Sequence, residues 1–179
     1  QYDDVMNKQR EVIYKERRKV LEGEDIHADI EAMIDSIIEK NIQFYNKMDH
    51  NNKHYLDMEG IVNFVTNIFG FEKNFLDGYN GNSVEDLISY VEDLAAKKYT
   101  EKEAEFTPDK FREIERVVLL QVVDQKWMDH IDAMDQLRTG IGLRAVGQVD
   151  PVRAYAQEGF DMFEEMNESI KEDTVKTVS

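Results

Sequence analysis

Two of the four histidines in this sequence have a spacing that suits metal ligands. His50 and His54 lie four residues apart, which on a helix would place both side chains on one face, and Asp49 and Asp57 lie nearby. The segment 49–52 is rich in turn-forming residues, however, so a helix is not predicted there. We interpret the pair as part of a solvated turn and expect no metal site. A metal-dependent enzyme that uses His50 and His54 is the lesser alternative.

His130 is the other histidine with suggestive neighbours, since it is flanked by Asp129 and Asp132 and lies one helical turn from Trp127. A catalytic dyad also needs a nucleophile, and no Ser or Cys stands at a recognisable spacing from this histidine. The sequence contains no P-loop, no glycine-rich dinucleotide fingerprint and no HExxH motif. We therefore expect no catalytic residue, and we interpret His130 as a histidine at the edge of a packed helical hairpin.

A segment between two long helical patterns stands out by its charge. The charged residues of this segment are Arg138, Arg144, Asp150 and Arg153. They give it an excess of two positive charges within an acidic chain. Residues Leu143 to Gln148 combine one Arg with Val146, small neighbours and an amide. Such a tip offers apolar contact and backbone hydrogen bonds, so it could touch many polypeptide sequences without selecting one. A simple turn between two helices is the alternative.

Two amphipathic helices are predicted to hold this segment between them. Thr107–Pro108 combines a capping hydroxyl with proline at the first helical position, and Asp150–Pro151 repeats that start. Apolar residues then recur at steps of three or four over 109–141 and over 152–170, as on one helix face. The connection, at about 142–150, is surrounded by glycines: Gly140, Gly142 and Gly147. This pattern predicts an antiparallel helical hairpin.

Folding the chain near Val146 sets the register of this hairpin. It brings Gly159 opposite Ala133 and places Phe163 and Met166 around Trp127. Gly costs roughly 1 kcal/mol relative to Ala inside a helix, so we infer that the two arms approach closely at Gly159. The hairpin buries too few side chains to offset its own ordering entropy, so it needs another surface. The opening helix is the candidate.

The opening region, 1–47, places apolar residues at helical spacing on both sides of Gly23. One long kinked helix and two stacked helices both satisfy this pattern, and Asp25 is a candidate cap for the second part. The apolar residues of the second part cover more than one stripe. We therefore expect it to be contacted from several sides.

The middle region, 48–106, has more turn residues than the rest of the chain. It contains one short helical pattern ended by Gly70 and a second that Ser83 caps, with Asp86 as a capping-box partner. We predict a small helical subdomain here. The fold class is all-α, with domains 1–47, 48–106 and 107–179.

Composition narrows the function classes. The chain has 22 Lys and Arg against 38 Asp and Glu, and the net charge of −16 disfavours phosphate backbones, so nucleic acid is not expected as a partner. The absence of Cys excludes disulfides, cysteine zinc sites and thiol catalysis. No apolar run reaches the ~20 residues of a membrane span. The chain opens at QYDDVMNKQR without an initiator Met, so we expect it to be part of a larger protein.

Two blocks of this sequence resemble the SecA family, the motor subunits of bacterial preprotein translocase. YDDVMNKQREVIYKER (Tyr2–Arg17) is similar to the start of the family's helical scaffold domain. VVDQKWMDHIDAMDQLRTGIGLRAVGQVDPVRAYAQEGFDMF (Val122–Phe163) is similar to its two-helix finger. The middle region matches the helical wing domain only by its order along the chain.

The resemblance implies that 1–47 and 107–179 form the helical scaffold, that 48–106 forms the wing, and that the finger loop enters the mouth of the SecYEG channel. That loop would contact the translocating preprotein, and the hairpin region would restrain ATPase activity when no preprotein is engaged. Carried over by position, the tip residues are Leu143, Arg144, Ala145, Val146, Gly147 and Gln148. The residues assigned to hairpin packing are Trp127, Ala133, Gly159, Phe163 and Met166.

The family's ATP and Mg belong to motor domains that this chain lacks, so the resemblance implies neither a cofactor nor enzymatic activity here. The implied partners are the preprotein, SecYEG and the protein's own motor and preprotein cross-linking domains. The implied location is the cytoplasm, with peripheral association at the inner face of the cell membrane.

The tip departs from the family pattern at two positions. Many members carry an aromatic residue, often Tyr, where this chain has Val146, and His where it has Gly142. A mechanism in which one aromatic ring grips the substrate therefore does not transfer unchanged. A free-standing helical adaptor that binds a protein along its acidic face is the alternative function.

Overall fold

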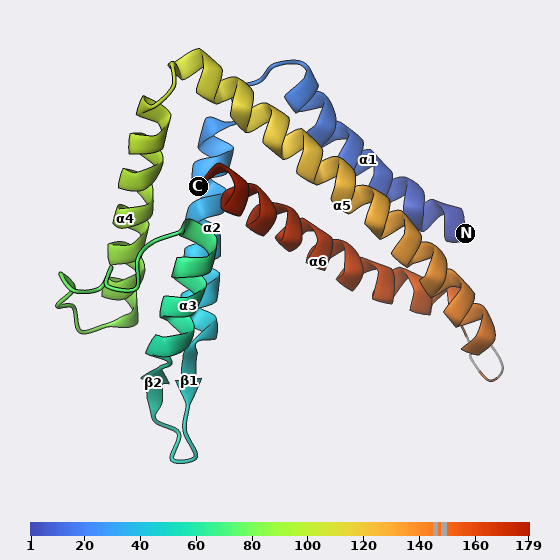
Figure 1. Cartoon of the computed structure of the whole chain (residues 1–179). Helices are drawn as coiled ribbons and strands as arrows, with labels where there is room; N and C mark the ends of the chain where they lie inside the picture. The colour runs from blue at the N-terminus through green and yellow to red at the C-terminus, as the bar shows by residue number, and fades with distance from the viewer. Residues whose placement is uncertain (145–146, 148–149) are drawn as a thin grey trace. The chain divides into compact units, whose positions relative to one another are not determined.

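The computed structural model describes residues 1–144, 147 and 150–179, and it is 78% helical. The described elements, in chain order, are α1 (Tyr2–Leu21), α2 (His27–Phe44), β1 (Asn46–Met48), β2 (His54–Leu56), α3 (Met58–Phe69), α4 (Val84–Ala104), α5 (Pro108–Arg144) and α6 (Pro151–Val178). The predicted all-α class is confirmed (Figure 1). No helix in the described ranges is both long and apolar enough to cross a membrane.

The chain divides into two compact units. Unit 1 comprises 1–25 and 116–170, and unit 2 comprises 26–115 and 171–179. Helices α5 and α6 each contribute residues to both units. The domain boundaries predicted after residues 47 and 106 separate a scaffold from a wing, which is a functional division. The two compact units do not test that division, so these boundaries stay predictions.

The starts of α4, α5 and α6 follow the predicted capping chemistry. The Ser83 hydroxyl accepts a hydrogen bond from the Asp86 amide at 3.0 Å and caps α4. The Thr107 hydroxyl accepts from the Lys110 amide at 3.4 Å, and the Asp150 carboxylate accepts from the Arg153 amide at 3.0 Å. Each bond satisfies an amide that the first turn of a helix leaves without a partner.

The opening region contains two separate helices and not one long kinked helix. Helix α1 ends at Leu21, and Gly23 takes a φ of +82°, a conformation that other L residues rarely adopt. The prediction that Asp25 caps the next helix is wrong. The residue before α2 is Ile26, and its side chain makes no capping bond.

Unit 2 is built around α2. Helix α2 packs against α3, α4 and β1, as its broad apolar coverage predicts. Its isoleucines are buried on more than one side, and they are Ile30, Ile34, Ile37, Ile38 and Ile42. Helix α3 ends at Gly70, which adopts the left-handed conformation, as predicted.

Sequence analysis missed the small hairpin of unit 2. Strands β1 and β2 pair antiparallel, with Asn46 opposite Leu56 and Met48 opposite His54. The turn between them was predicted, and the Asp49 carboxylate accepts from the amides of Asn51 and Lys53 at 2.8 and 2.9 Å. Strands of three residues are too short to show an alternating pattern, so only the turn left a signal.

Unit 1 is a three-helix assembly in which α1 and α6 both lie against α5 (Figure 1). Its apolar core is formed by Met134, Ile141 and Tyr155, and Tyr2, Val5 and Met6 of α1 pack against that core. Helix α1 is therefore the additional surface that the hairpin was expected to need.

Candidate functional site

The candidate site is the closed end of the α5–α6 hairpin in unit 1. Leu143, in the last turn of α5, has 81% of its surface exposed. Gly147 is an exposed turn residue with a φ of +93°, which glycine adopts without strain. The other predicted tip residues, Ala145, Val146 and Gln148, lie outside the described residues.

The charge of this end differs from what the sequence suggests. The Arg144 guanidinium donates to both carboxylate oxygens of Glu158, at 3.2 and 2.7 Å, and Arg138 lies 3.5 Å from Asp3. The bond to Glu158 raises the pKa of Arg144, and the same bond lowers the pKa of Glu158. Two of the positive charges counted along the sequence thus have acidic partners, and the local excess is smaller than predicted.

Helix α5 extends further into the predicted connection than the sequence pattern indicates. Gly142, Leu143 and Arg144 are helical, although the sequence places the connection at about 142–150. Among the described residues, no atom lies within 4 Å of where a Cβ on Gly140 or Gly142 would stand, so no packing contact among them accounts for either glycine.

The residues assigned to hairpin packing lie behind the tip. Trp127, Phe163 and Met166 are buried, and Ala133 is half-buried. A Cβ on Gly159 would stand 2.6 Å from the Met134 methyl group, so Met134, the neighbour of Ala133, lies against this glycine.

A hydrogen-bonded cluster ties the three helices of unit 1 together. The Gln9 amide nitrogen lies 3.2 Å from the Gly159 carbonyl oxygen, and the Gln9 amide oxygen lies 2.6 Å from His130 Nε2. The His130 ring stacks on Trp127 and meets the edge of Phe163, with centroids 5.6 Å apart in both pairs.

His130 is thus an interior residue of unit 1, whereas the sequence places it at the edge of the hairpin. Its burial lowers its pKa, because the charged imidazolium loses hydration. Gln9 continues the helical spacing of the apolar residues Tyr2, Val5 and Met6, and sequence analysis assigned it no role. Its polar side chain at a core-facing position was the available signal.

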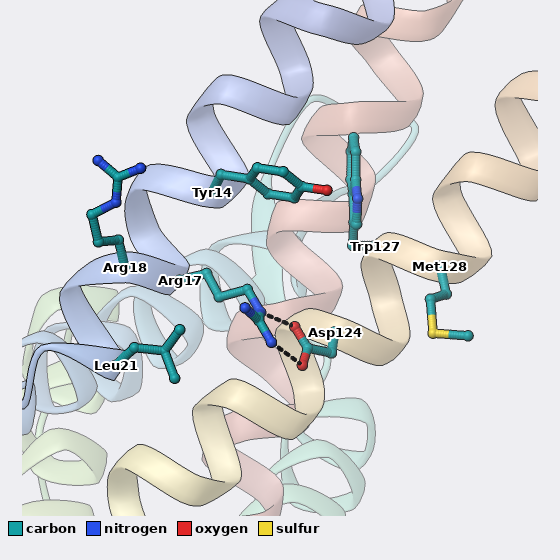
Figure 2. Close-up of a pocket in the computed structure, with 7 residues that line it drawn as sticks. All are labelled: Tyr14, Arg17, Arg18, Leu21, Asp124, Trp127 and Met128. Atoms are coloured by element: carbon teal, nitrogen blue, oxygen red, sulfur yellow. Dashed lines mark hydrogen bonds and ion pairs between the residues drawn. The ribbon is translucent and has the colours of Figure 1, made fainter.

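An apolar groove of about 410 Å³ runs between α1 and α5 within unit 1. Figure 2 shows Tyr14 pointing toward Trp127, with Leu21 and Met128 at the rim. The Arg17 guanidinium binds the Asp124 carboxylate beside them, at 2.8 and 3.4 Å. The groove has room for an apolar side chain next to an ion pair, and no sequence pattern indicated it.

Unit 2 contains a second buried polar cluster that sequence analysis missed. The Glu115 carboxylate is fully buried and accepts from Tyr99, while His27 Nδ1 and Arg112 lie 2.7 and 2.9 Å from it. Burial, together with the bond to Glu115, raises the pKa of Tyr99 far above its ordinary value. The cluster joins α2, α4 and the start of α5, and its contacts support a structural role.

The remaining histidine pair does not have the geometry that a metal site would need. His54 begins β2 and His50 lies in the turn before it, so the two side chains do not share a helix face. Within the described ranges, no group of three or more His, Cys, Asp or Glu side chains could hold a metal ion.

Comparison with known proteins gives concordant matches. A family model described as the SecA wing and scaffold domain matches residues 1–179. The chain is 55% identical over 177 residues to the protein translocase subunit SecA of Alkaliphilus oremlandii, 54% over 175 residues to that of Finegoldia magna, and 52% over 180 residues to the protein translocase subunit SecA 1 of Clostridioides difficile. Each match covers 98% of this chain and only 19–20% of the relative, so the chain spans about a fifth of these proteins.

Proposed function

Because this chain belongs to the SecA family, as its wing and scaffold domain, we propose that it is a non-catalytic helical module of a protein-translocating motor. In this proposal the α5–α6 hairpin is the two-helix finger, and its closed end contacts the polypeptide being moved. Helix α1 is the scaffold element that carries movement to the finger.

One observation carries the proposal, which is the shape of the hairpin in unit 1. Residues 116–144 of α5 form a continuous helix of roughly 43 Å at 1.5 Å per residue. Residues 151–170 of α6 run back along it, with Tyr155 near Ile141 and Phe163 at His130. A rod that is packed along its length and exposed at its end is suited to transmit a push to a loop without bending.

The tip has the chemistry of an unselective contact. Leu143 offers an exposed apolar surface, and the Arg144 charge is balanced by Glu158. With that charge balanced, the described part of this end would contact many chain sequences weakly. We assign the contact surface to Leu143, Arg144, Ala145, Val146, Gly147 and Gln148.

The partners follow from the same proposal. They are the preprotein, the SecYEG channel, and the motor and preprotein cross-linking domains of the parent protein. We assign ATP and Mg to the motor domains, and we place the assembled protein in the cytoplasm with peripheral association at the channel.

Site-specific crosslinking tests this function directly. In a full-length SecA relative that carries residues 1–179 in place of its own segment, Val146→Cys and Leu143→Cys should crosslink to a stalled preprotein. Phe160→Cys is the matched control, because Phe160 is also exposed in unit 1 but lies along α6, away from the tip. It should give little or no product.

Absence of crosslinks at every tip position, with translocation intact, would defeat the proposal. Equal crosslinking at Phe160 would show that contact is not specific to the tip.

A further inference from the structure

Gln9 occupies an unusual position in unit 1, because one side chain bonds to both arms of the hairpin. Its amide nitrogen binds the Gly159 carbonyl of α6, and its amide oxygen binds His130 of α5. Both Gln9 and His130 are buried, and both bonds link residues more than a hundred positions apart in sequence.

The chemistry of the three groups fixes the direction of every bond. A backbone carbonyl can only accept, so the Gln9 NH₂ group must face Gly159. The Gln9 oxygen then faces His130, and His130 must donate from Nε2. Burial lowers the pKa of His130, so the ring is neutral at pH 7 and its single proton lies on Nε2. The result is one directed chain of donors from α5 through α1 to α6.

Helix α6 is closely packed at Gly159. A Cβ at this position would meet Met134 and stand 3.8 Å from the Gln9 nitrogen. With glycine there, the amide of Gln9 reaches the backbone of α6 in a region closed by the Trp127 and Phe163 rings around His130.

The other contacts between α1 and the hairpin are less directional. Tyr2, Val5 and Met6 make apolar contacts, which tolerate a small slide of one helix on another. The ion pairs Arg17–Asp124 and Arg138–Asp3 are solvent-accessible, so water can replace them when the helices move. The bonds of Gln9 are buried and would both break if α1 moved along the hairpin.

We propose that Gln9 is a positioning residue that fixes the register of α1 against both arms of the finger, so that movement of the scaffold helix reaches the tip. This inference rests on the proposed function for its consequence in translocation. The register itself can be measured without that function.

Two variants separate positioning from simple stability. Gln9→Met keeps the length of the side chain but leaves the His130 donor without a partner. Combining Gln9→Met with His130→Leu removes that unpaired group as well, and replacing both partners of a buried bond by apolar groups restores most of the lost stability. Arg17→Met is the matched control, because it removes an exposed bond from the same helix to α5.

The first measurement is the distance between spin labels at Val12→Cys on α1 and Met128→Cys on α5, two exposed sites of unit 1. In the full-length relative that carries this chain, the distribution should broaden or shift by several ångströms, up to about one helical turn of ~5.4 Å, in both Gln9 variants. It should stay narrow in Arg17→Met. An unchanged distribution in both Gln9 variants overturns the inference.

The second measurement is the length of preprotein translocated per ATP hydrolysed. It should fall several-fold in both Gln9 variants and stay near wild type in Arg17→Met. If it recovers in the double variant together with the melting temperature, Gln9 is only structural and the inference is overturned. Tip crosslinks to preprotein that persist in the Gln9 variants show that the proposed function stands independently of this result.

Discussion

His130 has 4% of its surface exposed, and its burial lowers its pKa from the ordinary value of 6.5. The unfolded chain therefore takes up a proton at this histidine at a higher pH than the folded chain does. The contribution of His130 to the free energy of unfolding is fully present above about pH 6.5, which is the ordinary pKa of histidine in an unfolded chain. This contribution is lost as the pH falls toward the lower pKa of His130 in the folded chain. Acid thus weakens unit 1 in the range where histidine titrates.

We predict that the free energy of unfolding falls between about pH 7.5 and pH 5 more steeply in the wild type than in the Gln9→Met/His130→Leu variant. All other titratable groups are common to both proteins, so their contributions cancel in the comparison. Urea unfolding followed by circular dichroism at each pH measures the difference. Parallel pH profiles would contradict a neutral buried His130.

Glu115 is a buried titratable residue of unit 2, as His130 is of unit 1. Its carboxylate is fully buried, accepts a hydrogen bond from Tyr99, and lies within 3 Å of His27 and Arg112. Glu115→Gln removes the charge that these partners surround, and we expect it to lower the free energy of unfolding by roughly 3 kcal/mol. Glu113→Gln, at an exposed position on the same helix, should change it by less than about 0.5 kcal/mol. Equal effects of the two substitutions would contradict a stabilising role for the cluster.

Neither cluster could be assembled from the sequence. Each joins residues that are far apart along the chain, such as Gln9 with His130 or His27 with Glu115, and periodicity reports only which face of a helix is apolar. The signal that remained was a polar residue at a core-facing position. Gln9 met that description, whereas Glu115 is masked by the many carboxylates of this acidic chain.

At the level of elements, local chemistry was sufficient where a cap or a glycine decides the geometry. The starts at Ser83, Thr107–Pro108 and Asp150–Pro151 and the stop at Gly70 follow from side chains within a few residues. The β1–β2 strands were missed because each has three residues. The start of α2 was misplaced because no side chain caps it.

The cap at Asp150 gives a direct test at this scale. Asp150→Ala removes the bond to the Arg153 amide and should destabilise the chain by about 1 kcal/mol, while Asp150→Asn should retain most of the stability. Asp161→Ala, at an exposed position within α6, is the control and should have little effect. Thermal unfolding of the three variants gives the comparison, and a loss at Asp161 as large as that at Asp150 would argue against the cap.

At the scale of the whole molecule, the chain forms two units with their own cores, and it spans about a fifth of its relatives. The family and the all-α class were predictable because the finger block is long and its residue pattern is specific. The division after Asp25 and after Glu115 was not, because it depends on which long-range contacts each helix makes. The sequence of α5 and that of α6 each show one continuous helical periodicity, although each helix contributes residues to both units.

We propose that the closed end of the hairpin delivers the motor's work to a polypeptide. The most direct test replaces residues 144–149 by a Gly/Ser sequence of equal length in a full-length SecA relative carrying this chain. We predict that ATP hydrolysis continues while the length of preprotein translocated per ATP falls at least tenfold. Translocation at the wild-type ratio, with the same replacement, would show that this end of the hairpin does not deliver that work.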